Sequence, residues 1–308
     1  MARKLRILAL AVVSLSGCVA LTGLALNAPP TRLILKYGVQ TQPMPTGRTV
    51  VIEGMEFVEI GPGCVQMGYD GGGQDGSWLN RFGARLGLEF LVKAEYSDEL
   101  PVHWVEFSDG FWIARTEVTN NQFKRFASQP DLYDQPGAQR HPVGNVGWSE
   151  ATRFCVWLAE FSGLPVRLPA ESEWECACRA GTSTAFSFGN DWKELDRYAW
   201  HAGNATGGTS EVGERQASRW GLFDFHGNLA EWCEDRYVMD YSQSPVNGQA
   251  QTKGGEILDG FPQHVVRGGS WISSWLFCRS AARDVGHRPQ GYPWVGFRPA
   301  FTLLGEVK

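Results

Sequence analysis

The stretch that decides the fold is Arg167-Leu-Pro-Ala-Glu-Ser-Glu-Trp-Glu-Cys-Ala-Cys-Arg-Ala-Gly181. Its central part, Glu171–Arg179, predicts a short helix that Gly181 ends. Trp174 is a bulky apolar side chain and is expected to anchor a core. Two arginines and three glutamates share this stretch, and we interpret them as ion pairs that hold the fold rather than as catalytic groups. These residues are Arg167, Arg179, Glu171, Glu173 and Glu175.

The rest of the chain has the composition of a globular, loop-rich protein. It contains 308 residues, of which 43% are hydrophobic, and this is enough for one large core or two small ones. Its 37 Gly and 13 Trp, with only 20% charged residues, favour a fold pinned by buried aromatic side chains over a helix bundle. The formal charge of −5 argues against nucleic acid as a partner.

The N-terminus has the pattern of an export signal. Residues 3–6 carry three positive charges and precede the apolar stretch Ile7–Gly17. The sequence Leu15-Ser16-Gly17-Cys18 is similar to a bacterial lipobox, which predicts a signal peptide over residues 1–17 and lipidation of Cys18. The alternative is an uncleaved signal anchor over residues 7–26, because this apolar run is long enough to span a bilayer. Both interpretations predict a membrane-attached protein in the bacterial periplasm.

Residues 18–50 predict a tether, and residues 51–308 predict one globular domain. Alternating apolar residues predict a strand over Met55–Ile60 and paired strands within Val102–Thr116. Farther along, Thr119-Asn-Asn-Gln122 fits a capping box at the start of a helix.

Another helix is expected to begin at Ser149, whose hydroxyl can cap it. Apolar residues then recur at spacings of three and four, which predicts a single buried stripe. The stripe consists of Phe154, Trp157, Leu158 and Phe161.

The segment Arg167–Gly181 resembles the signature stretch of the formylglycine-generating enzyme family, whose unit is the sulfatase-modifying factor domain. Further segments match in the family's order, namely Glu99–His103, Ile113–Thr119, Pro142–Trp148, Gly221–Trp232, Arg267–Trp271, Arg279–Arg283 and Gly296–Arg298. The resemblance implies an α+β fold related to C-type lectins, rich in Gly and Trp and low in regular secondary structure. The glycines Gly268 and Gly269 suit a close approach of the backbone, and Ala170 replaces the family's usual Thr cap.

The resemblance also implies what chemistry to look for. Family members that make formylglycine hold Cu(I) between two cysteines that follow the Arg-Gly-Gly-Ser element, because soft thiolates suit this ion. In this chain Ser273 stands at the first cysteine position, and the segment that carries the second is shortened. A hydroxyl is a poor ligand of Cu(I), so we expect a member that lacks the paired copper-binding cysteines and does not use copper.

Six cysteines besides Cys18 leave 15 possible pairings open. By resemblance, we expect Cys278 in a disulfide with Cys178 or Cys176, the alternative being a reactive thiol. The resemblance further implies a structural calcium site. Its ligands would be the carboxylates of Asp224 and Glu231 and the backbone carbonyls of Gly227 and Leu229, which are hard oxygen donors. A second family site near Asn204 lies on a loop that is shortened here.

Three hypotheses for function follow. The first is a binding or regulatory accessory factor of an envelope machine or membrane kinase pathway, with an envelope protein or peptide as partner. The second is a periplasmic oxidase of altered chemistry, such as one that matures a peptide siderophore. Its candidate residues are His226, Glu231, Ser270, Ser273, His287 and Arg288. The third is a copper-dependent formylglycine-generating oxidase that relies on Cys278. We interpret His103 and His264 as structural or surface histidines.

Overall fold

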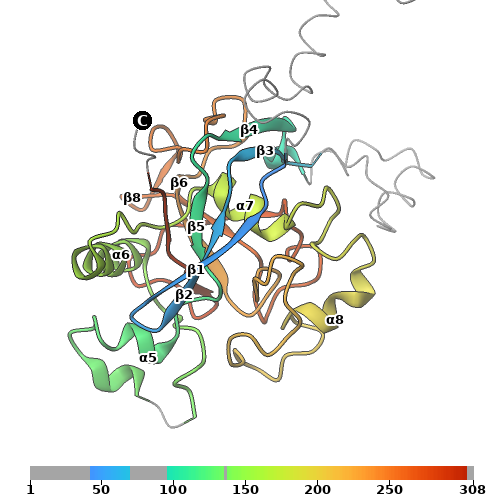
Figure 1. The fold of residues 1–308 in the computed structure, drawn as a ribbon. Coiled ribbons are helices and arrows are strands. Elements are labelled where there is room, and N and C mark those ends of the chain that lie inside the picture. The colour runs from blue at the N-terminus through green and yellow to red at the C-terminus, as the bar shows by residue number, and fades with distance from the viewer. Residues whose placement is uncertain (1–41, 70–95, 135–136, 304–308) are drawn as a thin grey trace, which may run out of the picture.

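The computed structural model describes residues 42–69, 96–134 and 137–303 (Figure 1). Most of this chain is turn and loop between short elements. The strands are β1 (Pro45–Ile52), β2 (Met55–Ile60), β3 (Gly63–Met67), β4 (His103–Phe107), β5 (Phe111–Ala114), β6 (Ala230–Arg236), β7 (Ile257–Leu258), β8 (Phe261–Pro262), β9 (His264–Arg267), β10 (Arg283–Gly286), β11 (Val295–Gly296) and β12 (Ala300–Phe301). The α-helices are α5 (Asn120–Phe123), α6 (Trp148–Ser162), α7 (Glu171–Arg179) and α8 (Leu195–Tyr198), and the 3-10 turns are Ser97–Glu99, Pro130–Tyr133 and Trp192–Glu194. This is the expected α+β fold.

Two four-stranded sheets form the framework. One has the order β1-β2-β5-β12, and the other has the order β10-β9-β6-β11, in which β11 runs parallel to β6. Two-stranded ribbons, β3-β4 and β7-β8, complete the sheet structure. Because β12 pairs with β5 near the start of the domain, the C-terminal residues close the fold onto its N-terminal strands.

The helix predicted from the signature stretch is α7, with the predicted bounds of Glu171 and Arg179. Every residue of α7 is buried, and the helix packs on β3, β6 and β9 between the sheets. Ala170 offers no side-chain cap, as expected from its replacement of the family's usual Thr. The Glu173 side chain instead accepts a hydrogen bond from the Ala170 N–H at 2.8 Å. A charged helix can be buried only because its acids are paired.

The glutamates of α7 form the ion pairs predicted from the signature stretch, and they also pair with arginines from distant parts of the chain. Arg167 binds Glu173, with Nη1 and Oε2 2.6 Å apart, and Arg179 binds Glu175 at 2.7 Å. Glu175 also pairs with Arg267 on β9. Burial opposes ionisation of Glu175, but Arg179, Arg267 and the Gly68 N–H outweigh it and lower the pKa of this carboxyl.

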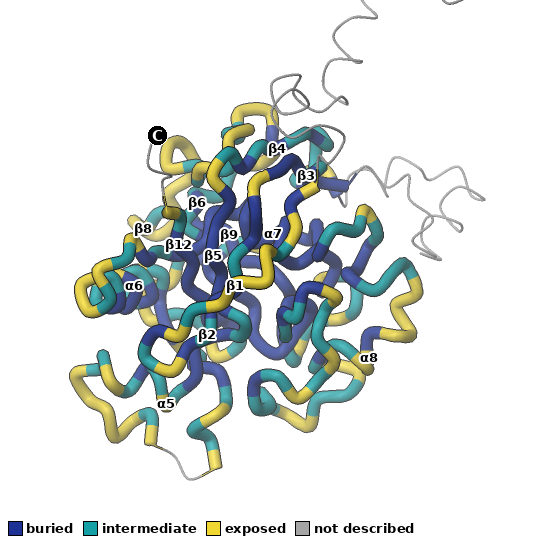
Figure 2. Tube along the Cα trace, in the orientation of Figure 1, coloured by how far each residue is buried: buried dark blue, intermediate teal, exposed yellow. Residues whose placement is uncertain are grey.

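Two apolar clusters fill the space around this ionic centre, and the buried part of the trace runs through the middle of the molecule (Figure 2). One cluster lies under α6 and includes Phe123, Phe154 and Trp232. The other surrounds Trp174 and includes Phe111 and Val265. The capping box at Thr119 is confirmed, since its hydroxyl accepts from the Gln122 N–H while the Gln122 side chain accepts from the Thr119 N–H.

Other local predictions need correction. The strand β1 begins at Pro45, so the tether boundary predicted at residue 50 lies inside a strand. The helix α6 starts at Trp148 after Gly147, so Ser149 lies within its first turn and does not cap it. The last turn of α6 extends past the core, which leaves the Phe161 side chain 62% exposed whereas Phe154 and Leu158 are fully buried.

Both N-terminal predictions, the lipobox at Cys18 and the anchor over residues 7–26, lie outside the described residues. Within the described part of the chain, no helix has the length and apolar character needed to cross a membrane.

Candidate functional site

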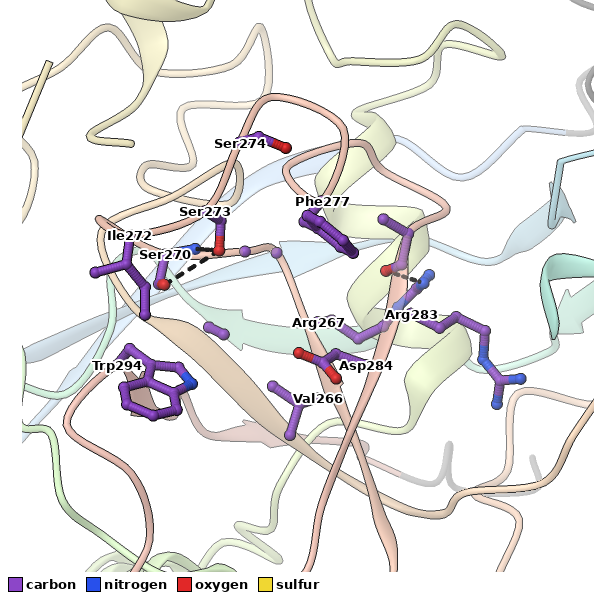
Figure 3. Close-up of a pocket in the computed structure, with 14 residues that line it drawn as sticks. Val266, Arg267, Ser270, Ile272, Ser273, Ser274, Phe277, Arg283, Asp284 and Trp294 are labelled. Carbon is purple, nitrogen blue, oxygen red and sulfur yellow. Dashed lines mark hydrogen bonds between the residues drawn. The ribbon is translucent and has the colours of Figure 1, made fainter. Parts of the chain in front are cut away.

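A cavity of about 330 Å³ opens beside the Arg-Gly-Gly-Ser element, between that loop and β10 (Figure 3). We call it the serine pocket. Its polar side chains are Ser270, Ser273, Ser274 and Asp284, and its apolar walls include Val266, Ile272, Phe277 and Trp294. The sequence prediction therefore found the loop side of this pocket and missed the opposite wall.

The two glycines of the loop shape the pocket as expected. Gly268 and Gly269 have φ angles of +96° and +65°, which a residue with a side chain adopts only with strain. A Cβ on Gly268 would lie 2.9 Å from the Trp174 ring, and one on Gly269 would lie 2.9 Å from the Cys278 sulfur. The loop consequently lies flat on the core.

The hydroxyl of Ser273 is held in place. Ser273 Oγ accepts a hydrogen bond from the Ser270 N–H at 3.0 Å, and the Oγ atoms of Ser270 and Ser273 lie 3.2 Å apart (Figure 3). Ser270 is fully buried, whereas Ser273 is partly open to the pocket. Ser273 is therefore the hydroxyl of this pair that a ligand can reach, and a neutral hydroxyl can both donate and accept hydrogen bonds.

The two arginines in the wall of the pocket already bind other groups of the protein. Arg267 donates to the carbonyls of Ala281 and Ala282, each at 2.6 Å. Arg283 binds the Glu171 carboxylate at 2.7 Å and stacks on Tyr241, with 4.4 Å from its guanidinium carbon to the ring centre. The two arginines therefore fix β10 and its approach against β9.

The unpaired charge of the pocket is the carboxylate of Asp284. This side chain projects toward the cavity in Figure 3 and accepts a hydrogen bond from the Val285 N–H at 2.7 Å. Desolvation by the surrounding residues raises its pKa above the ordinary value. An alternating polar residue in the short strand β10 is the signal by which the sequence could have suggested Asp284.

Cys278 lies behind the pocket and not in it. Its thiol is fully buried and next to Gly269, and burial raises its pKa well above the ordinary value. His226 shares this cluster, since its Nδ1 lies 2.8 Å from the Cys278 carbonyl oxygen and its Nε2 accepts from the Ser187 N–H at 3.1 Å. Burial lowers the pKa of His226 to about 4, so the ring is neutral near pH 7.

The six cysteines outside the N-terminus are buried free thiols in this structure. Cys178 faces the same His226 ring, with its sulfur 3.7 Å from Nδ1, whereas Cys176 contacts neither Cys278 nor this histidine in any hydrogen bond of the described residues. The disulfide of Cys278 stays a prediction, and of the two partners Cys178 is the one in this cluster.

Glu231 lies in the core. Its carboxylate forms a two-point ion pair with Arg298, with distances of 2.6 and 2.7 Å, and also accepts from the Trp174 indole N–H at 2.8 Å. Both oxygens of this predicted calcium ligand are therefore engaged by donors of the protein. It does not line the serine pocket.

Asp224 fits a hard cation better. Its Oδ2 accepts from the Gly213 N–H at 2.7 Å, but its Oδ1 is buried with no hydrogen-bond partner. Burial raises the pKa of Asp224 to about 6, and burial together with Asp224 raises that of the neighbouring Glu117. Glu117, which sequence reasoning missed, accepts from the Leu229 N–H at 3.1 Å.

The donor set for calcium is thus one free carboxylate oxygen, a nearby second carboxylate and the predicted carbonyls of Gly227 and Leu229. No group of three or more His, Cys, Asp or Glu side chains converges to hold a metal anywhere in the described residues. Near the doubtful second site, the Asn204 side chain is occupied, because it donates to Ala199 and accepts from the His201 N–H. His287 and Arg288 line a separate cavity.

Comparison with known proteins identifies the family. The profile of the "Sulfatase-modifying factor enzyme 1-like domain" matches residues 46–303. The chain is 32% identical over 232 residues to the serine/threonine-protein kinase Pkn1 of Chlamydia trachomatis serovar L2, covering 66% of this chain and 35% of that protein. It is 29% identical over 246 residues to the formylglycine-generating enzyme of Thermomonospora curvata, covering 71% and 74% of the two chains.

Two solved structures share the fold. PvdO from Pseudomonas aeruginosa superposes with a TM-score of 0.68 at 24% identity over 84% of this chain and 99% of that one. The Treponema denticola variable protein 1 superposes with a TM-score of 0.65 at 23% identity over 84% and 100%. The chain spans about a third of the length of the kinase relatives that it matches. Because the profile covers most of its length, this chain belongs to the sulfatase-modifying factor family, which includes the formylglycine-generating enzymes.

Proposed function

We propose that the domain is a binding module that presents the serine pocket to a protein or peptide partner, and that it is an accessory factor of an envelope assembly or a membrane kinase pathway. The observation that carries this proposal is the hydrogen-bonded pair Ser270 and Ser273 at the place where a formylglycine-generating member needs thiolates. Oxygen donors of this kind bind Cu(I) poorly, but they recognise polar groups of a ligand well.

The environment of Cys278 supports the same proposal. A catalytic thiol needs to be accessible and to ionise near neutral pH. Cys278 is fully buried behind Gly269, and burial raises its pKa. None of the described residues that line the serine pocket is Cys, His or Met, so its lining offers hydroxyls, a carboxylate and apolar surface.

This lining also suggests the class of ligand. Arg267 and Arg283 are ion-paired with Glu175 and Glu171, whereas Asp284 is the lining carboxylate that forms no ion pair with any described residue. Phe277, Ile272 and Trp294 add apolar walls around it. A peptide segment that carries Lys or Arg next to an apolar side chain complements such a surface.

The relatives support a link between this domain and protein kinases. Proteins named as kinases carry this domain in about a third of their length, so family members occur as one part of a kinase chain. The basic and apolar N-terminus supports export and attachment to the membrane, by lipid at Cys18 or by an anchor over residues 7–26. Export would place the serine pocket among envelope proteins.

Calcium is part of the proposal, as a structural ion. Asp224 and Glu117 would supply carboxylate oxygens, with the carbonyls of Gly227 and Leu229, and a divalent cation would balance the buried negative charge there. When bound, calcium would supply electrostatic neutralisation and hold the Asp224–Leu229 turn. Glu231 remains in its ion pair with Arg298.

The test uses the full chain purified in detergent and a random peptide library. We expect enrichment of peptides that combine a basic and an apolar residue. By fluorescence anisotropy, Asp284→Asn should weaken binding of a selected peptide about tenfold through loss of one charge-assisted contact. The matched control is Asp240→Asn, because Asp240 is exposed and its hydrogen bonds go to the N–H and the hydroxyl of Ser242.

Two results would refute the proposal. The first is equal peptide affinity of wild type and Asp284→Asn. The second is turnover: formylglycine formation from a Cys-containing sulfatase peptide with Cu(I) and oxygen, detected by mass spectrometry, would identify an oxidase. Oxygen consumption with a siderophore precursor that Ser270→Ala abolishes would favour an oxidase of altered chemistry.

A further inference from the structure

A second cavity, of about 200 Å³, lies where the first turn of α6 meets β6, β9 and the β7–β8 hairpin. Figure 1 shows α6, β6 and β8 on the same side of the molecule. We call it the His264 pocket. The residues that matter for its chemistry are Trp148, Ser149, Arg236, His264, His287 and Arg288.

The pocket is lined by positive charge. Arg236 and Arg288 form no ion pair with any carboxylate in the described part of the chain, and none of the described lining residues is acidic. Asp259 lies 3.9 Å from His287, and its side chain is 82% exposed and thus well hydrated. Two unpaired arginines at one cavity attract an anion.

His264 is a buried side chain of which one ring nitrogen, Nδ1, has no partner among the described residues. It is 6% exposed and stacks on Trp148, with ring centres 3.7 Å apart and planes 14° apart. Strand pairing sets Arg236 opposite His264. Burial and Arg236 lower the pKa of His264 to about 4, although hydrogen bonds to the backbone of Asp235 and Glu234 oppose this shift, so the ring is neutral.

The start of α6 adds two more donors. Gly147 precedes the helix and offers no side-chain cap, and its carbonyl accepts only from Glu150 and Ala151. The N–H groups of Trp148 and Ser149 are therefore the unsatisfied donors of the first turn of a helix of 15 residues. The helix dipole favours negative charge at this end.

We propose that the His264 pocket binds a phosphoryl group, either as free phosphate or as the headgroup of an anionic phospholipid. Two guanidinium groups, the Ser149 hydroxyl, a neutral imidazole and a helix N-terminus match the several oxygens of a tetrahedral oxyanion. The exposed apolar side chains of Ile257, Leu258 and Phe261 adjoin the pocket on the β7–β8 hairpin, which would suit a lipid source. This site is separate from the serine pocket and does not depend on its function.

The experiment titrates inorganic phosphate into the full chain and follows binding by calorimetry and by ³¹P NMR. We expect saturable binding of one phosphate per chain. Arg236→Gln and Arg288→Gln should each weaken it about tenfold, as for the loss of one charge-assisted contact. The matched control is Arg140→Gln, because Arg140 is also at the surface and is paired with Glu211, and it should bind as the wild type does.

A second part of the experiment identifies the source of the phosphoryl group. The full chain in detergent is incubated with beads that carry immobilised phosphatidylglycerol or phosphatidylcholine. Retention on phosphatidylglycerol that Arg288→Gln abolishes and phosphate competes would assign the headgroup, and phosphate binding without retention would assign a soluble ligand. Absence of saturation, or equal phosphate affinity in Arg288→Gln and the wild type, would overturn the site. Arg288 is exposed, so this variant tests the idea even if Arg236→Gln unfolds.

Discussion

Replacing Arg298 by Met tests whether Glu231 is held by an ion pair or is free to bind a metal. Arg298 is fully buried and gives Glu231 two charge-assisted hydrogen bonds. It also donates to the Phe223 carbonyl at 2.9 Å. Met fills a similar volume but leaves the buried carboxylate without its counter-ion.

The expected cost follows from this burial. Removing one partner of a buried pair costs about 3–5 kcal/mol, because the other charge stays desolvated and unpaired. For a domain of this size each kcal/mol lowers Tm by roughly 2–4 °C, so we expect a fall of about 6–20 °C. Urea unfolding followed by tryptophan fluorescence gives the free energy directly. The control Arg140→Met removes an exposed pair with Glu211 and should change stability by about 1 kcal/mol at most.

The effect of added calcium on stability distinguishes two roles for Glu231, as the ion-pair partner of Arg298 or as a calcium ligand. If the ion pair is its role, added calcium stabilises wild type and Glu231→Gln by the same increment, while Asp224→Asn loses that increment. If Glu231 is a calcium ligand, Glu231→Gln abolishes the increment. A cost below about 1 kcal/mol for Arg298→Met would refute the reasoning about buried charge.

Three more predictions follow from the same contacts. Burial raises the pKa of Asp224 to about 6, above its ordinary 3.8, so the folded state binds the Asp224 proton more tightly than the unfolded state does. In EDTA, the free energy of unfolding should therefore decrease as pH rises from about 4 to 6. A free energy of urea unfolding that stays constant over this range, or the same decrease in Asp224→Asn, would contradict this prediction. Gly269→Ala should destabilise by roughly 1–3 kcal/mol because φ is +65° and the new Cβ would lie 2.9 Å from the Cys278 sulfur, whereas Gly208→Ala, with nothing within 4 Å, should be neutral in the same urea assay. Protein recovered from an oxidising compartment should yield a disulfide-linked Cys178–Cys278 peptide in a non-reduced digest. Because Cys278 is buried, it should resist alkylation in the reduced protein until the protein is unfolded. A free Cys278 that is rapidly alkylated would instead indicate a reactive thiol.

The sequence was most informative where the physics is local. The capping box at Thr119 and the helix Glu171–Arg179 depend on residues within one turn of each other, and both are confirmed. The prediction that acids of this helix serve as ion pairs is also confirmed. The second partner of Glu175, Arg267, lies 92 residues away and could not be assigned from spacing.

The errors share a different cause, which is packing by distant segments. The helix α6 starts one residue before Ser149 because the Trp148 indole donates to the Cys233 carbonyl at 2.8 Å and Pro289 leaves Gly147 no room for a side chain. Strand β1 extends to Pro45 because it pairs with β2. Asp284 and Trp294 reach the serine pocket from β10 and from the loop before β11, and no local pattern joins them to the serines.

The separation between scaffold and pocket is consistent with the binding function that we propose on this family's fold. The ion pairs of Glu175 with Arg267 and of Glu171 with Arg283 fix both walls of the serine pocket from behind, and neither contributes a free charge to it. The conformation of the loop depends on Gly268 and Gly269, which have no side chains in the cavity. If the pocket binds a ligand as we propose, a substitution at Asp284 should alter what it binds without disturbing these contacts, whereas Ser273 also holds the loop through the Ser270 N–H. The side chains that face the pocket, rather than the signature stretch that builds it, are then the ones that determine the ligand.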